Sequence, residues 1–442
     1  MDLDAKTAKT LEIQIWSYND DLVIPGEIPY EGETFKVTCI GKRTFQDYDN
    51  IKSVIIPNTV TYIGEDAFRR CRALTSITWS NSLETIGESA FRECTSLTSV
   101  EIPSSTIKIQ DFAFEDCSNL TSVTTADGLI AIGDYSFYRC AKLTSINISN
   151  SVESIGKYAF YQCSGLSSIV IPNSMLSIGR GAFESCSSLT SLTIPNSVTY
   201  IGECITLGDN SITSIIVEEG NANYDSRNNC NAIIETATNK LIAGCNNTII
   251  PDGVTTLGWY CLGCLTEFNK IDIPNTVSII ENGVFYGTSL TSVKLPDSLT
   301  SIALSVFEEC NGLTEITIPE LVTYVGYRAF YSSNLKQVVS LIKDPSINSI
   351  NIDLDAFNSY TYSSGTLYVP EGTLSEYKKS YPWYKFKNIK EGSPSAISSV
   401  SLDEQTSESG RYTLEGKKLS EPQKGLNIIR YEDGSAKKKL MK

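Results

Sequence analysis

The sequence contains no histidine among its 442 residues. This absence excludes every catalytic triad or dyad in which an imidazole activates serine or cysteine, and every zinc site with a histidine ligand. Acidic residues are plentiful, but they are scattered through variable positions and do not converge into the paired carboxylates that acid–base chemistry needs. We therefore expect no catalytic residues, no metal and no cofactor, and we predict that the chain is not an enzyme.

Positive charge and long apolar runs are also scarce. The 36 Lys and Arg residues are outnumbered by 51 Asp and Glu residues, which gives a net charge of −15. Since nucleic-acid binding needs a basic surface, we expect no nucleic-acid partner. No run of about 18 apolar residues occurs, so we expect no membrane insertion. Residues 1–20 have no basic stretch followed by an apolar one, and so they lack the pattern of a signal peptide.

A phenylalanine recurs every 23 residues through the first half of the chain. The repeated residues are Phe45, Phe68, Phe91, Phe114, Phe137, Phe160 and Phe183. Around the last six the pattern is Ile-Gly-x-x-[Ala/Ser]-Phe-x-x-Cys, with Ile109-Gln110 in place of Ile-Gly once. After each Phe comes a stretch that usually reads Leu-x-x-[Ile/Val/Leu]-x-apolar and ends at Pro or a substitute. The same phase resumes at Pro251, Pro274, Pro296 and Pro319, so the chain is an array of repeats.

One repeat corresponds to one coil of a solenoid. Alternation in Leu-x-x-Ile-x-Ile indicates a short strand with its large side chains inward, and the following Pro ends the strand because it has no N–H to donate. Ile-Gly supplies a second inward side chain and a permissive corner. The Ala-Phe-x-x-Cys segment is too short for an independent helix, so we predict a 3₁₀ or one-turn helix that directs Phe inward. Stacked coils then share one continuous core.

This pattern resembles the treponemal, or BspA-like, class of leucine-rich repeats found in bacterial surface proteins, over about residues 40–370. The resemblance implies a curved solenoid with a parallel sheet on its concave face. Together with the residue pattern, this predicts an α/β repeat solenoid: a right-handed coil of about 23-residue repeats, with short helices on its convex side and capped ends. It also implies adhesive or interaction roles outside the cell. We therefore expect an extracellular or outer-surface location.

The pattern divides the chain into four parts. These are an N-terminal β cap over residues 1–40, the solenoid over 41–370, a capping helix and linker over 371–394, and a small β module over 395–442. Thr373 and Glu376 fit a capping box at the start of an amphipathic helix over Leu374–Ser380. Caps are expected because an uncovered end coil would expose the unpaired edge of its strands.

Two segments lie outside the repeat phase. An insertion around residues 218–250 lengthens one repeat, and its Asn231–Ala243 stretch predicts a hairpin that turns near 237–239. The insertion is either a projecting element that binds a ligand or a decorated coil that seals a local irregularity. The tail alternates like three short strands and resembles C-terminal appendages of secreted Bacteroidetes proteins. It is either an export or attachment signal or a β module with no targeting role.

Cysteine occupies one slot of the repeat rather than a disulfide pattern. The residues in this slot are Cys71, Cys94, Cys117, Cys140, Cys163, Cys186 and Cys310. A stacked core of this size needs no disulfides, so we interpret the column as buried thiols that act as small apolar groups. Cys261-x-x-Cys264 lacks the second pair that a metal site would need. A disulfide among Cys204, Cys230 and Cys245, in the irregular region, is left open.

The x positions of the predicted strands offer the widest surface to a ligand. In three adjacent repeats they hold Thr98, Ser99, Glu101, Thr121, Ser122, Thr124, Thr144, Ser145 and Asn147, which we call the Thr/Ser face. Threonine favours exposed strands for its β-propensity alone, but a broad hydroxyl surface could also hold a protein or glycan through many weak hydrogen bonds. Aromatic anchors are missing from these nine positions, so no single residue is predicted to dominate binding.

These observations favour a non-enzymatic, adhesin-like binding protein of the cell surface or the secreted fraction. We expect a monomer whose partner is a host or bacterial extracellular protein or glycan. The alternative is a structural surface protein that assembles with itself.

A second candidate surface is an aromatic and charged rim around the Phe segments, made of Arg69, Arg70, Arg92, Tyr138, Arg139, Tyr161 and Tyr331.

Overall fold

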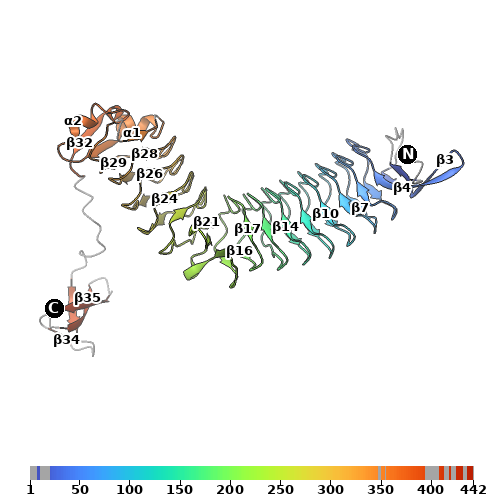
Figure 1. Ribbon diagram of the computed structural model, residues 1–442, viewed down its shortest axis with the longest axis horizontal. Coiled ribbons are helices and arrows are strands. Elements are labelled where there is room, and N and C mark those ends of the chain that lie inside the picture. The colour runs from blue at the N-terminus through green and yellow to red at the C-terminus, as the bar shows by residue number, and fades with distance from the viewer. Residues whose placement is uncertain are drawn as a thin grey trace. The chain divides into compact units, whose positions relative to one another are not determined.

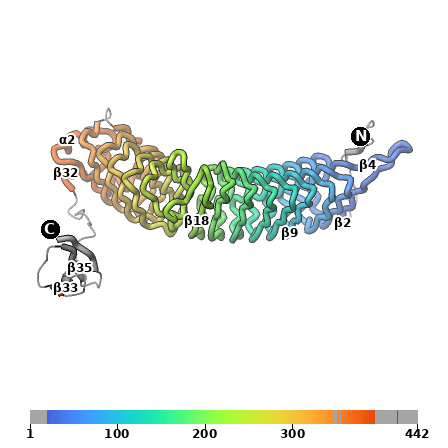
Figure 2. The backbone as a smooth tube through the Cα atoms, turned by 60° about the horizontal axis from the view of Figure 1, so that its bottom comes forward, coloured from blue at the N-terminus to red at the C-terminus, as the bar shows by residue number. Residues whose placement is uncertain are grey.

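The computed structural model describes most of the chain. The described residues are 7–9, 20–346, 350–353, 355–393, 408–412, 418–419, 425–431 and 436–441. They belong to two compact units, Met1–Gly392 and Ser393–Lys442, and each unit is described by itself below. The larger unit is a row of coils that stack side by side from the N-terminal end onward (Figures 1 and 2).

Most coils contain the strand predicted from Leu-x-x-Ile-x-Ile, and strands over Asp21–Val23 and Asn388–Glu391, which the pattern did not predict, extend the same ladder at its two ends. Together these strands are β2 (Asp21–Val23), β5 (Ser53–Ile55), β7 (Ser76–Thr78), β9 (Ser99–Glu101), β11 (Ser122–Thr124), β13 (Ser145–Asn147), β16 (Ser191–Ile194), β18 (Ser214–Val217), β23 (Lys270–Ile271), β25 (Ser292–Val293), β27 (Glu315–Ile318), β29 (Gln337–Ser340), β31 (Thr366–Val369) and β32 (Asn388–Glu391). They pair in parallel within five sheets. The repeat and the solenoid architecture are therefore confirmed.

A second parallel ladder runs along the coils, at the position of Ile-Gly. We call it the Ile-Gly ladder; its strands are β4 (Glu33–Ile40), β6 (Tyr62–Ile63), β8 (Thr85–Ile86), β10 (Lys108–Ile109), β12 (Ala131–Ile132), β14 (Ser154–Ile155), β15 (Ser177–Ile178), β17 (Tyr200–Ile201), β22 (Thr256–Leu257), β24 (Ile279–Ile280), β26 (Ser301–Ile302), β28 (Tyr324–Val325) and β30 (Asn351–Ile352). Sequence reasoning assigned this position only an inward Ile and a corner. The glycine serves close packing instead, since a Cβ on Gly87 would lie 2.3 Å from the carbonyl oxygen of Ile63.

The segment around each Phe forms a series of turns, not the predicted 3₁₀ or one-turn helix. In the coil of Phe68, Asp66 and Arg70 have positive φ angles of 53° and 61°. This left-handed conformation turns every second N–H toward the next coil: the amide of Phe68 donates to the carbonyl of Ala90 at 2.8 Å. The intervening amides bond within the turn, as from Cys71 to Phe68 at 3.1 Å. A helix would satisfy only its own coil, whereas these turns hydrogen-bond neighbouring coils as well.

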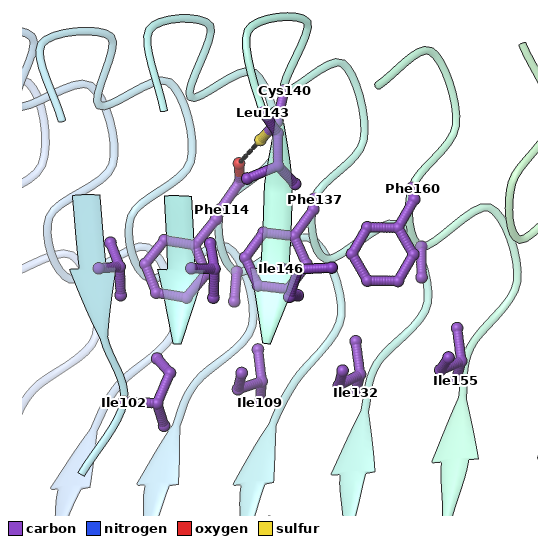
Figure 3. Packing of buried hydrophobic residues seen from close by; sticks show 14 of the residues in the cluster. Ile102, Ile109, Phe114, Ile132, Phe137, Cys140, Leu143, Ile146, Ile155 and Phe160 are labelled. Carbon is purple, nitrogen blue, oxygen red and sulfur yellow. Dashed lines mark hydrogen bonds between the residues drawn. The ribbon is translucent and has the colours of Figure 1, made fainter. Parts of the chain in front are cut away.

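The phenylalanine rings form a column through the core. Phe114, Phe137 and Phe160 stack nearly parallel, with neighbouring ring centroids 5.4 and 5.5 Å apart, and Ile132 and Ile155 lie beside them (Figure 3). All five side chains are buried. The core of the larger unit consists of two clusters, one that extends from the first coils to the insertion and one from the insertion to the C-terminal cap.

The insertion does not project from the coils, because its hairpin lies between the two core clusters. Strands β20 (Ala232–Glu235) and β21 (Lys240–Gly244) pair antiparallel, and β21 pairs in parallel with β22, in the position of the Ile-Gly ladder. Ile233 packs in the first cluster and Ile234 in the second. β19 (Tyr224–Asp225) and the 3₁₀ helix η1 (Arg227–Asn229) lead into the hairpin. This arrangement matches a decorated coil that seals an irregularity.

Short strands cover the N-terminal end of the larger unit. β1 (Thr7–Lys9) pairs in parallel with β4, and β3 (Glu27–Tyr30) pairs with it antiparallel. Leu22 and Val37 are buried against the first coils. Residues 11–15, which belong to the predicted N-terminal β cap, lie outside the described residues.

The helix that follows the last repeats is shorter than predicted, and its capping box does not form. α2 covers only Leu374–Tyr377, and the Thr373 hydroxyl donates to the carbonyl of Pro370 at 2.7 Å instead of accepting from the helix. Oε1 of Glu391 accepts from the amides of Gly372 and Leu374, at 2.9 and 3.1 Å. Glu391, at the end of β32, therefore satisfies two amides at the start of the helix, whereas the Thr373 amide, which the capping box would have satisfied, donates to the carbonyl of Pro370 at 3.2 Å.

Aromatic side chains close the C-terminal end of the core. Trp383, in the 3₁₀ helix η2 (Trp383–Lys385), is fully buried beside Phe357, and Phe386 is also buried. Tyr381 and Tyr384 are exposed, so of the four aromatic residues in this segment only Trp383 and Phe386 cover the core. The helix α1 (Ser359–Ser364) precedes β31, and β32, rather than β31, is the outermost strand.

The smaller unit contains a four-stranded antiparallel sheet. Its strands are β33 (Glu408–Tyr412), β34 (Lys418–Leu419), β35 (Gly425–Tyr431) and β36 (Ala436–Met441). The sequence predicts three strands here, and four are described because Tyr412 and Leu419 belong to separate strands, β33 and β34, that pair with each other. Its targeting role stays a prediction.

Candidate binding surface

The Thr/Ser face lies on one three-stranded sheet made of β9, β11 and β13. The strands pair with a constant shift of one repeat, so that Ser99, Ser122 and Ser145 align in one row across the sheet. Glu101, Thr124 and Asn147 align in a second row. Eight of the nine side chains are exposed and Ser122 is half-buried. The structure therefore places all nine predicted residues together on one surface.

Some hydroxyls of this face already serve the stacking of coils. The hydroxyl of Thr121 donates to the carbonyl of Thr98 at 2.8 Å, and the hydroxyl of Thr144 donates to the carbonyl of Thr121 at 3.1 Å. These oxygens can still accept a hydrogen bond, but their protons are occupied. The row of Glu101, Thr124 and Asn147 makes no such bond within the described residues, so it is the better candidate for contact with a ligand.

The sheet of the Thr/Ser face ends at the next coil. Residues 166–171 repeat the strand pattern but are not part of a sheet, and Val170 in the row of Asn147 is 78% exposed. The paired strands resume at β16, where Thr193 holds the same position. The face is thus bounded by an exposed apolar side chain on its C-terminal side.

The rim around the Phe segments is engaged in contacts between coils. Arg70 forms an ion pair with Glu93 at 3.1 Å, and Arg92 forms one with the largely buried Glu115 at 3.0 Å. Burial raises the pKa of the Glu115 carboxyl, and Arg92 opposes this shift. In the following coils the rim becomes aromatic. The rings of Tyr138 and Tyr161, one repeat apart, stack at 4.8 Å. Three further contacts lie within single coils: Arg139 lies over Tyr138, Arg328 lies over Tyr331, and Arg69 forms an ion pair with Asp66.

The cysteine column consists of buried thiols with a shared hydrogen bond. Sγ of Cys140 donates to the carbonyl of Phe114 at 3.3 Å (Figure 3), and the same bond recurs in the other coils of the column. Burial raises the pKa of Cys117 to about 12 and of Cys310 to about 11. All 13 cysteines lie in the described residues as thiols, and so no disulfide joins Cys204, Cys230 or Cys245.

Sequence reasoning missed a buried carboxyl at the junction of the two core clusters. Asp209 occupies the cysteine slot and Thr206 the phenylalanine slot of the coil after Phe183, a substitution that the repeat register alone makes visible. Asp209 is 1% exposed, and within the described residues neither carboxyl oxygen has a hydrogen-bond partner of normal geometry. Burial raises its pKa well above the usual value, and the nearby backbone of Cys186 offsets this only in part.

Sequence reasoning also missed a shallow groove on the Ile-Gly ladder. The groove has a volume of about 330 Å³ and crosses β10, β12, β14, β15 and β17. Its length coincides with a run of small side chains in the first position of these strands: Ala131, Ser154 and Ser177, between Lys108 and Tyr200. Comparing each residue with those one repeat away would have revealed this run.

Neither a metal site nor a membrane-spanning helix is seen in the described part of the chain. No group of three or more Cys, Asp and Glu side chains there is arranged to hold a metal ion. Among the same residues, no helix has the length and apolarity needed to cross a bilayer.

Comparison with known proteins shows the same repeat. The family model described as BspA type Leucine rich repeat region matches residues 38–141, 130–239 and 234–363. The chain is similar to a leucine rich cell surface protein of Faecalibacterium prausnitzii A2-165, with 24% identity, a TM-score of 0.60, and coverage of 89% of this chain and 93% of that chain. It is also similar to the pneumococcal vaccine antigen PcpA, with 19% identity, a TM-score of 0.53, and coverage of 85% and 90%. No curated protein matches. At these identities, the solved structures show the fold alone.

Proposed function

Because the chain belongs to the family of BspA-type leucine-rich repeat proteins, we propose that it is a non-enzymatic binding protein of the bacterial cell surface or the secreted fraction. Its partner in this proposal is an extracellular protein or glycan of the host or of other bacteria. It acts as a monomer.

The observation that carries this proposal is the fixed register of exposed polar side chains on the Thr/Ser face. Parallel pairing with a one-repeat shift holds Glu101, Thr124 and Asn147 in a row at a spacing of about 4.8 Å. A rigid, repetitive array of this kind presents many polar contacts without a large ordering cost when a ligand binds. Such contacts are individually weak, so affinity depends on the area of the whole face.

The two solved relatives support an exposed location. One is described as a cell surface protein and the other as a vaccine antigen. Both descriptions refer to those proteins, and for this chain they motivate the proposal that it acts outside the cell.

The proposal is tested with the full chain against immobilised extracellular-matrix proteins, mucin and bacterial-surface polysaccharides. A variant with Thr124→Arg and Asn147→Arg places bulky charges in the exposed row, and Thr193→Arg, in the same position of β16, is the matched control. We expect at least one protein or polysaccharide to bind, and the double variant to bind it about tenfold more weakly, while the control retains its affinity.

Two results would overturn the proposal in different ways. Binding that is unchanged in the double variant would remove the Thr/Ser face as the site and leave the binding role intact. No binding to any probe by a folded chain would remove the binding role itself. Light scattering across concentrations then decides the alternative, since mass that grows with concentration is what a self-assembling surface protein would show.

A further inference from the structure

The groove on the Ile-Gly ladder is a built feature of five consecutive coils. Equivalent residues of β10, β12, β14, β15 and β17 pair in strict register, so the first residues of these strands form one row. In this row Ala131, Ser154 and Ser177 are small, and Lys108 and Tyr200 close the two ends. At about 4.8 Å between paired strands, the row covers roughly 19 Å. The groove therefore suits a narrow, extended ligand.

The floor of the groove cannot bind a peptide by adding it as a strand. The floor is formed by Gly133, Gly156 and Gly179, whose amides donate to Ile109, Ile132 and Ile155 of the preceding coils at 2.8 to 2.9 Å. Strand addition needs an edge with unpaired N–H and C=O groups, whereas β10, β12, β14 and β15 each pair with a strand on both sides and only β17 ends the sheet. Recognition in the groove must therefore come from side chains.

The charged side chains along the groove are of both signs. Oδ1 of Asp111 accepts from the amide of Asp134 at 2.9 Å, and Oδ1 of Asp134 accepts from the amide of Lys157 at 2.7 Å. These bonds fix the two carboxylates, while the second oxygen of each makes no hydrogen bond within the described residues. Lys108 and Lys157 are exposed, and neither forms an ion pair with a described residue. Two carboxylates and two ammonium groups cancel in net charge, but they supply both acceptors and donors.

An exposed aromatic ring completes the groove at one end. Tyr200 is 58% exposed at the first position of β17. An aromatic ring has an apolar face that stacks against other flat apolar surfaces, and its hydroxyl remains available to water or a polar ligand. The C–H face of a sugar ring is such a surface, and sugar hydroxyls are both donors and acceptors.

We infer that this groove is a second binding site, and that its ligand is a short, linear, uncharged oligosaccharide. One sugar ring stacks on Tyr200, and the hydroxyls of the following rings hydrogen-bond Asp111, Asp134, Lys108, Lys157 and Ser154. The inference rests on the proposed extracellular binding function and extends it by a ligand class and a surface separate from the Thr/Ser face.

The test is a binding screen against linear gluco-, manno-, galacto- and xylo-oligosaccharides and their sulfated counterparts, followed by calorimetric titration of the best ligand. Tyr200→Ala removes the stacking ring, and Ser154→Trp fills the groove. The later coils provide matched controls, because Tyr324 and Ser301 hold the same strand position outside the groove. Tyr324→Ala and Ser301→Trp therefore test whether an effect is specific to the groove.

We expect the best ligand to be uncharged. Tyr200→Ala and Ser154→Trp should each lower the affinity for this ligand by at least about tenfold. Tyr200→Phe, which keeps the ring, and both control variants should stay within about twofold of the wild-type affinity. The inference fails if only sulfated sugars bind, or if groove and control variants lose affinity equally. It also fails if only the double variant on the Thr/Ser face, with Thr124→Arg and Asn147→Arg, loses affinity for the oligosaccharide.

The failure of the inference differs from the failure of the proposed function. A chain that binds a matrix protein or mucin but no free oligosaccharide keeps the proposed function and loses the groove as a sugar site. A folded chain that binds none of the probes loses both.

Discussion

Each coil of the first core cluster depends on two side chains that occupy fixed positions. In the coil of Phe137, the ring stacks between Phe114 and Phe160, and the thiol of Cys140 donates to the carbonyl of Phe114. Each side chain thus contacts the coil before it. Because equivalent residues repeat in register, a change at one residue is felt by the neighbouring coils as well as its own.

Truncation of one ring should therefore be costly. Phe137→Ala is expected to lower the free energy of unfolding by about 3–5 kcal/mol, because the ring is fully buried and the stacked neighbours cannot close the cavity. Thr121→Ala, on the exposed face, should change it by no more than about 0.5 kcal/mol. Urea denaturation measures both, and a loss below about 1 kcal/mol for the first variant would contradict a core role for this ring.

The thiols of the column should be unreactive in the native protein. Burial raises their pKa, to about 12 for Cys71 and Cys117, so the thiolate that attacks an alkylating reagent is scarce at pH 8. We expect iodoacetamide to modify the column only in denaturant, where all 13 cysteines should react. Rapid labelling of Cys117 in the folded state, located by mass spectrometry, would contradict this placement.

Asp209 should make the stability depend on pH. The unfolded chain ionises this residue near pH 4, whereas the folded state raises its pKa, so ionisation favours unfolding increasingly as pH rises from about 4 toward the folded pKa. Asp209→Asn abolishes this titration. Relative to Asp209→Asn, the free energy of unfolding of the wild type should fall between about pH 4 and pH 7, by at most about 1.4 kcal/mol per pH unit. A constant difference in urea midpoints over this range would show that the carboxyl is not desolvated.

At the scale of elements, the glycine of the Ile-Gly ladder sets how closely coils stack. A Cβ at Gly156 would lie 2.4 Å from the amide nitrogen of Asp134, so Gly156→Ala should force the two coils apart. We expect a loss of about 1–3 kcal/mol, as for other overpacked sites. Ser154→Ala, two residues earlier on the exposed side, is the control and should change thermal stability little. Equal midpoints of thermal unfolding for the two variants would argue against close packing at the glycine.

The elements that could be predicted from the sequence are those marked by alternation within one repeat or by the same residue type at one position of every repeat. Leu-x-x-Ile-x-Ile alternates over enough residues to identify the long strands, and the 23-residue spacing fixes the Phe column. Apart from β4, the strands of the Ile-Gly ladder are two residues long, so they show no alternation. The turns around Phe use positive φ at Asp66 and Arg70, where no glycine marks the left-handed conformation.

The candidate site was predictable only in part, because its shape depends on residues far apart in the chain. The nine residues of the Thr/Ser face follow from the strand pattern alone. The groove forms because Ala131, Ser154 and Ser177 are all small, and each is one repeat from the next. The role of the hairpin depends on which core each of its faces meets: Ile233 and Ile234 are adjacent in sequence but belong to different clusters.

For the larger unit as a whole, that hairpin is the interface that couples two halves of the solenoid. The Phe column stops at Phe183 and resumes with Phe285, with Thr206 and Leu262 in the intervening slots. The hairpin replaces aromatic stacking with aliphatic packing on both of its faces. In a solenoid, unfolding is cooperative only as long as the interfaces between neighbours are strong enough, so this interface should limit cooperativity.

Weakening the hairpin should therefore separate the unfolding of the two halves. We expect one common urea transition for the wild type and two for a variant with Ile233→Ala and Ile234→Ala. Each truncation should lower the stability of one side of the interface by about 2–5 kcal/mol, because it removes a buried side chain. Trp79 packs in the first cluster and Trp383 in the second, so variants that keep one of them as the sole tryptophan report each half by fluorescence. If both reporters shift together in the double variant, the coupling runs through contacts other than the hairpin.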